Sequence, residues 1–307
     1  MTPNQSWVLR GNDFSKQGWH AKQTAGYRLM FEFLKISPSY EMARLHRTQG
    51  LTKDQKGVLP DDFDQVLRTY DLLGDVQKIL FRSWWLNRGL KAFGNPYSKP
   101  KVHKISLLPD ACDVAVTDIN NDLNHFLGET RGEEGLSGSL LVSIPVGGRR
   151  SDVLKQINKL LGQHNFVETT KRSEDRPKLA LMGKRLHVDA MLKGLGLLFW
   201  KSAQPKWENW RLGTFAELSK SYSEVLDYKA PKKTATTMEA VDRIIMGKIT
   251  SRALKRFELI AENAARGRFP CDEHVDCSTY NYLELQKRIK LRKQWEKSEK
   301  ERLARLI

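Results

Sequence analysis

Residues 250–268 read TSRALKRFELIAENAARGR, and this stretch says most about the fold. Thr250 or Ser251 is suited to cap a helix. At helical periodicity the apolar side chains share one face, and the polar ones gather on the other: Arg252, Lys255, Arg256, Asn263 and Arg266. Arg and Asn are also the residue types that contact guanine and adenine edges in a major groove. The segment predicts a helix with a nucleic-acid-binding face, the alternative being a surface helix whose basic face is only solvated.

The preceding stretch, residues 211–227 (RLGTFAELSKSYSEVLD), has the apolar spacing of two short helices around a polar break near Ser219. In a helix-turn-helix the second helix offers its N-terminal polar residues to a groove. Here those residues are Ser219, Lys220, Ser221 and Ser223. Two recognition-helix candidates therefore compete, 219–228 and 250–266. Between them lies a basic loop, 228–237, with Lys232 and Lys233, and we expect the helix that follows from residue 238 to break near Gly247.

The net charge points to the same class of partner. The 307 residues include 52 Lys and Arg against 36 Asp and Glu, a formal net charge of +16. Residues 151–307 contain 32 of the basic and 20 of the acidic side chains, a net charge of +12. Each Lys or Arg that neutralises a phosphate releases a condensed counterion, so such a chain is typical of a polyanion binder. An acidic protein surface, or a merely solubilising charge, would also fit.

Several classes of protein are disfavoured. The longest apolar run, residues 195–200 (LGLLFW), is far shorter than the roughly 20 residues of a membrane span. We expect no secretion signal at the N-terminus, and three cysteines form no disulfide framework, which fits a cytoplasmic protein. The sequence contains no GxSxG or HExxH motif, and we expect neither enzymatic activity nor a cofactor.

The chain is predicted to be mostly α, with a small α+β middle domain. We expect a helical N-terminal domain at 1–95, an α+β domain at 101–170, a helix-turn-helix-like basic domain at 178–270 and a basic C-terminal helix at 280–307. The linkers would be 95–100 (NPYSKP) and 169–177 (TTKRSEDRP). The α+β prediction rests on residues 140–146 (LLVSIPV), a β-like run that precedes a helix starting near Ser151.

Two weaker candidate sites remain. Gly147 and Gly148 are followed by Arg149 and Arg150 at the expected start of a helix, where backbone N–H groups and guanidiniums could contact a phosphate; an ordinary turn is the alternative. Cys271, His274 and Cys277 have metal-like spacing but supply only three of the four ligands of a structural zinc site, so no metal is predicted.

The run from Lys184 (KRLHVDAMLKGL) through Trp210–Gly213 to SRALKRFELIAENAARGRFP resembles the C-terminal helix-turn-helix domain of an uncharacterised regulator-like family of bacterial integrative and conjugative elements. YRLMFEFLKISPSYEMAR and LLVSIPVGGRRSDVLKQINKLL resemble the upstream portions of that family more loosely. About 120 residues are covered, and the loop 228–237 and the last 35 residues depart from the family. The resemblance implies a DNA-binding regulator of a mobile element.

We therefore predict a non-catalytic, DNA-binding regulator, with RNA as a possible ligand. The alternative is a structural subunit that grips nucleic acid in a larger antiphage or RNA-guided complex. A homodimer or a partner protein could form through the N-terminal helical domain. The predicted nucleic-acid-binding residues are Arg252, Lys255, Arg256, Asn263, Arg266, Lys220, Ser221, Lys232, Lys233, Arg149 and Arg150.

Overall fold

The computed structural model describes residues 18–94, 101–108, 116–131, 134, 138–163, 177–183, 186–231, 236–276 and 280–305. The chain divides into two compact units. The first, here called the helical unit, joins residues 1–94 to residues 177–307, and the second, the inserted unit, is residues 95–176. The N-terminal and C-terminal regions, which the sequence predicts as separate domains, thus belong to one unit.

The N-terminal part of the helical unit is built on α1 (Ala25–Ile36), which buries most of its length. Ser37 ends α1, and its hydroxyl accepts a hydrogen bond from the backbone N–H of Tyr40, which caps α2 (Pro38–Thr48). The short α3 (Lys53–Lys56) and α4 (Phe63–Leu73) follow. Next come α5 (Phe81–Trp84), a π-helical turn η3 (Trp85–Gly89) and α6 (Leu90–Phe93). Trp84 and Trp85 are buried core residues.

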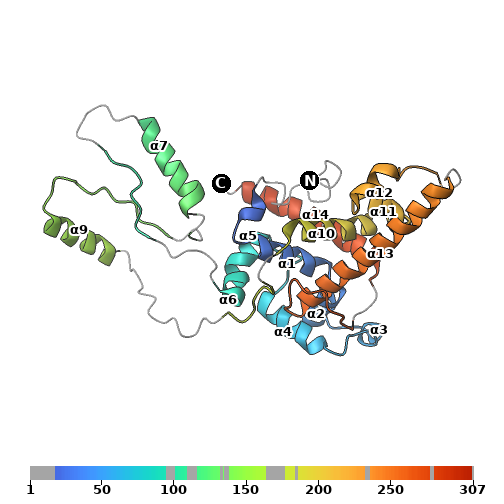
Figure 1. Ribbon diagram of the computed structural model, residues 1–307. Coiled ribbons are helices and arrows are strands. Elements are labelled where there is room, and N and C mark those ends of the chain that lie inside the picture. The colour runs from blue at the N-terminus through green and yellow to red at the C-terminus, as the bar shows by residue number, and fades with distance from the viewer. Residues whose placement is uncertain are drawn as a thin grey trace. The chain divides into compact units, whose positions relative to one another are not determined.

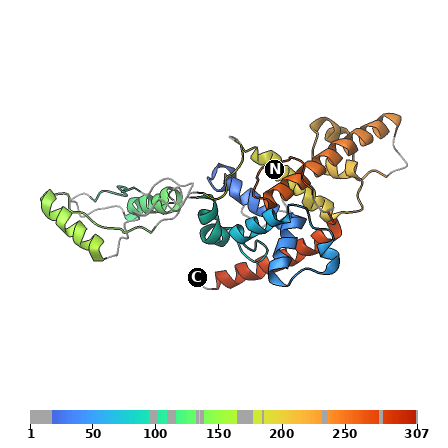
Figure 2. The ribbon, with the colours of Figure 1, turned by 90° about the horizontal axis from the view of Figure 1, so that it is seen from below.

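The C-terminal part adds α10 (Val188–Ala203), α11 (Asn209–Phe215), α12 (Lys220–Val225), α13 (Thr237–Ala265) and α14 (Tyr282–Ala304). Figure 1 and Figure 2 both show α13, in orange, running through the unit. It packs against α11 and also against α1, α2, α4 and α10. The expected break at Gly247 is wrong, because α13 continues through it. A single glycine destabilises a helix by only about 1 kcal/mol. The packing of α13 against α11 around Gly247 offsets this loss.

Buried polar side chains join the two parts of the helical unit. The fully buried carboxylate of Glu262 on α13 accepts a hydrogen bond from Ser37 Oγ at 2.6 Å and from the Ser39 backbone N–H at 3.1 Å. Arg266 reaches from the same helix to Asp62, just before α4, with N–O distances of 2.6 and 2.7 Å. The N-terminal helices are therefore fixed to α13 by groups about 200 residues away in the sequence.

The inserted unit contains α7 (Val116–His125), a π-helical turn η4 (Phe126–Thr130) and α9 (Arg150–Gln163). The predicted α+β middle domain is wrong, since the described residues of the chain form no strand beyond an isolated bridge between Leu181 and Phe269 of the helical unit. Residues 140–145 are exposed but have no regular secondary structure, and Val146 lies in a turn, so the segment forms no ladder. A strand needs a partner to satisfy its backbone groups, and the described residues supply none here.

Candidate nucleic-acid interface

Helices α11 and α12 form a compact helix-turn-helix. The turn between them includes Glu217, which has a φ of 51° although it is not glycine. Four residues earlier, Gly213 lies so close to α13 that an added Cβ would be 2.0 Å from Thr250 Oγ1. Trp210, Leu226 and Met246 form the small core that fixes both helices to α13, with Tyr222 packed against it. The close approach explains why the sequence has glycine at position 213.

Helix α12 presents little net charge. Lys220 and Ser221 at its start are exposed, as the sequence predicts for a recognition helix. However, the Lys220 ammonium lies 4.0 Å from the Glu224 carboxylate one turn later. The helix has only six residues, about 9 Å of length. It can contact a groove, but it cannot supply the main attraction for phosphates.

The exposed cations of α13 form a stripe that carries more positive charge than α12. Lys248, Arg252 and Lys255 are all exposed, and their spacing of four and three residues puts them on one face of the helix. Within the described part of the chain, none of the three lies in an ion pair. We call these three residues the α13 cationic stripe. The sequence prediction included Arg252 and Lys255 but missed Lys248, although its place one helical turn before Arg252 could have revealed it.

Arg256 lies beside this stripe but is partly neutralised. Its Nε is 2.7 Å from a carboxylate oxygen of Asp272. Both side chains are at least half exposed, so the pair adds little stability and can separate when a phosphate competes for the guanidinium. Arg256 is therefore a peripheral member of the interface.

Asn263 and Arg266 are not available for base contacts. Asn263 is fully buried, and its side-chain amide donates to the carbonyl oxygens of Leu259 and Glu273. Arg266 is also buried: it pairs with Asp62 and Glu262 and donates to the Asp276 carbonyl oxygen. Burial opposes the charge of Arg266, but the hydrogen bonds and charges of both acids outweigh it and raise its pKa. These two residues hold the helical unit together, which corrects the prediction that they read nucleic acid.

The chain leading to the basic loop is held by two arginines that the sequence prediction missed. Arg211 donates to the carbonyl oxygens of Tyr228 and Ala230, and Arg243 lies 3.4 Å from that of Pro231. Both guanidiniums also lie over the Trp210 ring, at 4.5 and 4.4 Å from its centroid. Lys232 and Lys233, predicted to bind nucleic acid, lie outside the described residues.

Arg149 and Arg150 belong to the inserted unit, where both are exposed at the start of α9. The Arg149 carbonyl accepts hydrogen bonds from the backbone N–H groups of Asp152 and Val153, as expected where a helix begins. The two arginines can contact a phosphate, and they belong to the inserted unit, whereas the α13 cationic stripe belongs to the helical unit.

Two of the three residues of the cysteine cluster lie within the described part of the chain. Cys271 is buried with a free thiol, His274 is exposed, and Cys277 lies outside the described residues. Among the described residues, no group of three or more His, Cys, Asp and Glu side chains is suited to hold a metal ion.

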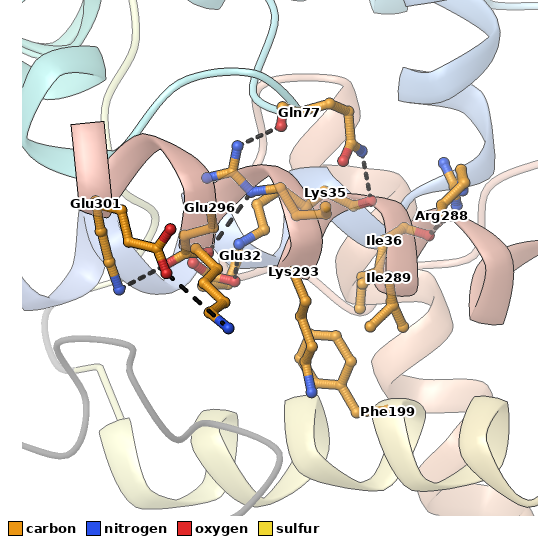
Figure 3. A pocket seen from close by; sticks show the side chains of 13 residues that line it. Glu32, Lys35, Ile36, Gln77, Phe199, Arg288, Ile289, Lys293, Glu296 and Glu301 are labelled. Carbon is orange, nitrogen blue, oxygen red and sulfur yellow. Dashed lines mark hydrogen bonds and ion pairs between the residues drawn. The ribbon is translucent and has the colours of Figure 1, made fainter. Parts of the chain in front are cut away.

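A groove of about 390 Å³ lies between α1, α10 and α14 (Figure 3). Its apolar lining includes Ile36, Phe199 and Ile289. Its charged rim combines six basic with three acidic side chains, and some of them pair, such as Lys300–Glu296 at 2.9 Å and Lys35–Glu32 at 2.5 Å. Burial lowers the pKa of Lys293 on the same rim despite the nearby Glu296 carboxylate. Its three glutamates each pair with a cation of the lining and would repel a phosphate, whereas no described acid pairs with the α13 cationic stripe.

The comparisons with known proteins identify no relative. No protein-family model, curated protein or solved structure matches the chain. In the described ranges, no helix combines the length and the apolar character needed to cross a membrane.

Proposed function

We propose that this protein binds nucleic acid in the cytoplasm, and that its ligand is duplex DNA held by the α13 cationic stripe beside the α11–α12 helix-turn-helix. The observation that carries the proposal is the stripe itself: Lys248, Arg252 and Lys255 lie on one exposed face, and none of them forms an ion pair with a described acid. Such a face attracts polyanions, and binding is favoured by the release of counterions.

The position of the stripe supports duplex DNA as the ligand. From residue 248 to residue 255 the stripe extends about 10 Å along α13. The core of Trp210, Leu226 and Met246 fixes α11 and α12 to the same long helix. In helix-turn-helix proteins one helix enters the major groove while neighbouring elements contact the backbone. We infer that the stripe contacts phosphates and that Lys220 and Ser221 face the groove, as in a regulator without catalytic activity.

The α13 and α14 helices differ in how their charges are compensated. Along α14, Lys287, Lys297 and Arg302 each pair with a glutamate three or four residues away. These pairs are exposed, and forming a phosphate contact there would require separating them. Although α14 is rich in basic residues, it is therefore the weaker candidate for the main DNA contact.

The test is a salt titration of binding to duplex DNA, single-stranded DNA and RNA, measured by fluorescence anisotropy with the full chain. The triple variant Lys248→Ala, Arg252→Ala, Lys255→Ala removes the stripe. If all three residues contact phosphates of B-DNA, the slope of log K against log salt falls in magnitude by about 2.7, since each contact contributes about 0.9.

The matched control is Lys53→Ala, Lys56→Ala, Arg68→Ala, which removes the same charge from exposed positions on α3 and α4. This control should keep the wild-type slope, because it changes net charge but not the interface. Equal slopes for the stripe variant and the wild type would exclude the stripe from the interface. A preference for RNA or single strands would instead favour the structural subunit of a nucleoprotein complex.

A further inference from the structure

The inserted unit exposes an unusual share of its apolar side chains. It forms about a quarter of the chain, yet it contains more than half of the large apolar side chains that are exposed in the described residues. Neither α7 nor α9 buries a residue, and Phe126 is the one buried apolar side chain among the described residues of this unit. A soluble unit with so little core normally covers such a surface with a partner.

Five of the exposed large apolar side chains of this unit lie in one short segment: Leu140, Leu141, Val142, Ile144 and Val146. Residues 140–146 (LLVSIPV) are exposed throughout, and Val146 reaches 80% exposure. Within the described residues, no backbone–backbone hydrogen bond involves this segment. Unpaired N–H and C=O groups together with β-branched side chains make a segment that readily pairs with another strand. We call residues 140–146 the apolar run.

The charge distribution indicates what pairs with the apolar run. Residues 138–148 (GSLLVSIPVGG) contain no ionisable side chain, whereas the chain as a whole has a net charge of +16. Two copies repel each other over most of their surface, but not where this uncharged segment meets itself. An acidic partner, in contrast, would gain more by binding one of the basic surfaces.

The side-chain pattern of the run is also self-complementary. In an extended strand Leu140, Val142, Ile144 and Val146 lie on one side. In an antiparallel pair about a two-fold axis at Ser143, Val142 of each copy faces Ile144 of the other, and Leu140 faces Val146. When the two Ser143 residues form a non-hydrogen-bonded pair, Pro145 faces Leu141 in another such pair. Its backbone groups then point away from the partner strand, which suits a residue without an N–H.

We propose that the inserted unit is a self-association module, in which the apolar runs of two copies pair as antiparallel strands about a two-fold axis at Ser143. This differs from a dimer through the N-terminal helices, which the sequence left open. It does not rest on nucleic-acid binding, because the run belongs to the inserted unit and the α13 cationic stripe to the helical unit.

The test is sedimentation velocity of the full chain at high salt over a wide concentration range. The wild type should be dimeric. Val142→Glu alone and Ile144→Lys alone each place one charge against an apolar side chain of the other copy, so each should raise the dimer dissociation constant at least tenfold. The double variant Val142→Glu, Ile144→Lys should recover most of that loss, because each Glu then faces a Lys of the other copy.

The control is Val102→Glu, a fully exposed position of the same unit outside the run, which should leave the dimer unchanged. All three positions are on the surface, so the helical content by circular dichroism should stay at the wild-type level. A monomeric wild type would overturn the proposal, as would single variants that dimerise like the wild type or a double variant as weak as the singles. None of these results bears on the salt slope of DNA binding, so the two proposals can fail separately.

Discussion

The conversion of Glu262 to Gln tests how the two parts of the helical unit are held together. The Glu262 side chain is fully buried and receives fixed donors on both oxygens: the Ser39 backbone N–H at 3.1 Å from Oε1 and Arg266 Nη1 at 3.1 Å from Oε2. A glutamine has almost the same shape, but one of its two positions is an NH₂ donor. Whichever way the amide is turned, it opposes a donor that cannot reverse its role.

The expected loss follows from these contacts. Removing one partner of a buried ion pair costs about 3–5 kcal/mol, because the other charge stays buried without full compensation. Arg266 keeps Asp62, so we expect the lower end, about 3 kcal/mol of the free energy of unfolding. For a unit of this size that corresponds to a fall in Tm of roughly 6–12 °C.

Urea unfolding followed by far-ultraviolet circular dichroism measures this loss. The control is Glu301→Gln, whose partner Lys297 lies 3.9 Å away and whose side chain is half-exposed. It should change the stability by less than about 0.5 kcal/mol. If Glu262→Gln cost less than about 1 kcal/mol, or no more than the control, the buried pair would not be what joins α2 and α4 to α13.

Two further predictions concern packing and pH. Gly213→Ala should lower the free energy of unfolding by about 1–3 kcal/mol, because the added Cβ would overlap Thr250 Oγ1. The control Gly196→Ala, whose Cβ would have no atom within 4 Å, should be neutral or stabilising in thermal unfolding. Equal losses of stability in the two variants would contradict the close approach of α11 to α13. Burial raises the folded-state pKa of several of the eight tyrosines. These side chains should stay neutral in the folded chain above about pH 10, where the same tyrosines ionise in the unfolded chain. The free energy of unfolding should therefore fall as the pH rises above about 10. Tyrosinate absorbance with and without urea checks this, and full titration of the folded chain near pH 10 would refute it; the tyrosines concerned are Tyr27, Tyr40, Tyr70, Tyr280 and Tyr282.

Local features of the fold could be predicted from the sequence. The Ser37–Pro38 pair separates α1 from α2, because serine caps a helix and proline suits its first turn. The helical periodicity of residues 250–265 also predicts a helix with one apolar face. These residues lie in α13, and the apolar side chains of Leu254, Phe257 and Ile260 are buried. These features depend on neighbours within one or two helical turns, which the sequence itself displays.

The availability of the candidate site residues was decided by the tertiary structure. Arg252 and Arg266 look alike on a helical projection of α13, but Arg252 is exposed and Arg266 is buried against Asp62, more than 200 residues earlier in the chain. The apolar run 140–146 has the composition of a strand, yet the described residues give it no partner. A sequence determines which face of a helix is polar and which segment favours extension. Only the packing of distant segments decides whether a charge meets solvent or a buried acid, and whether an extended segment finds a strand beside it.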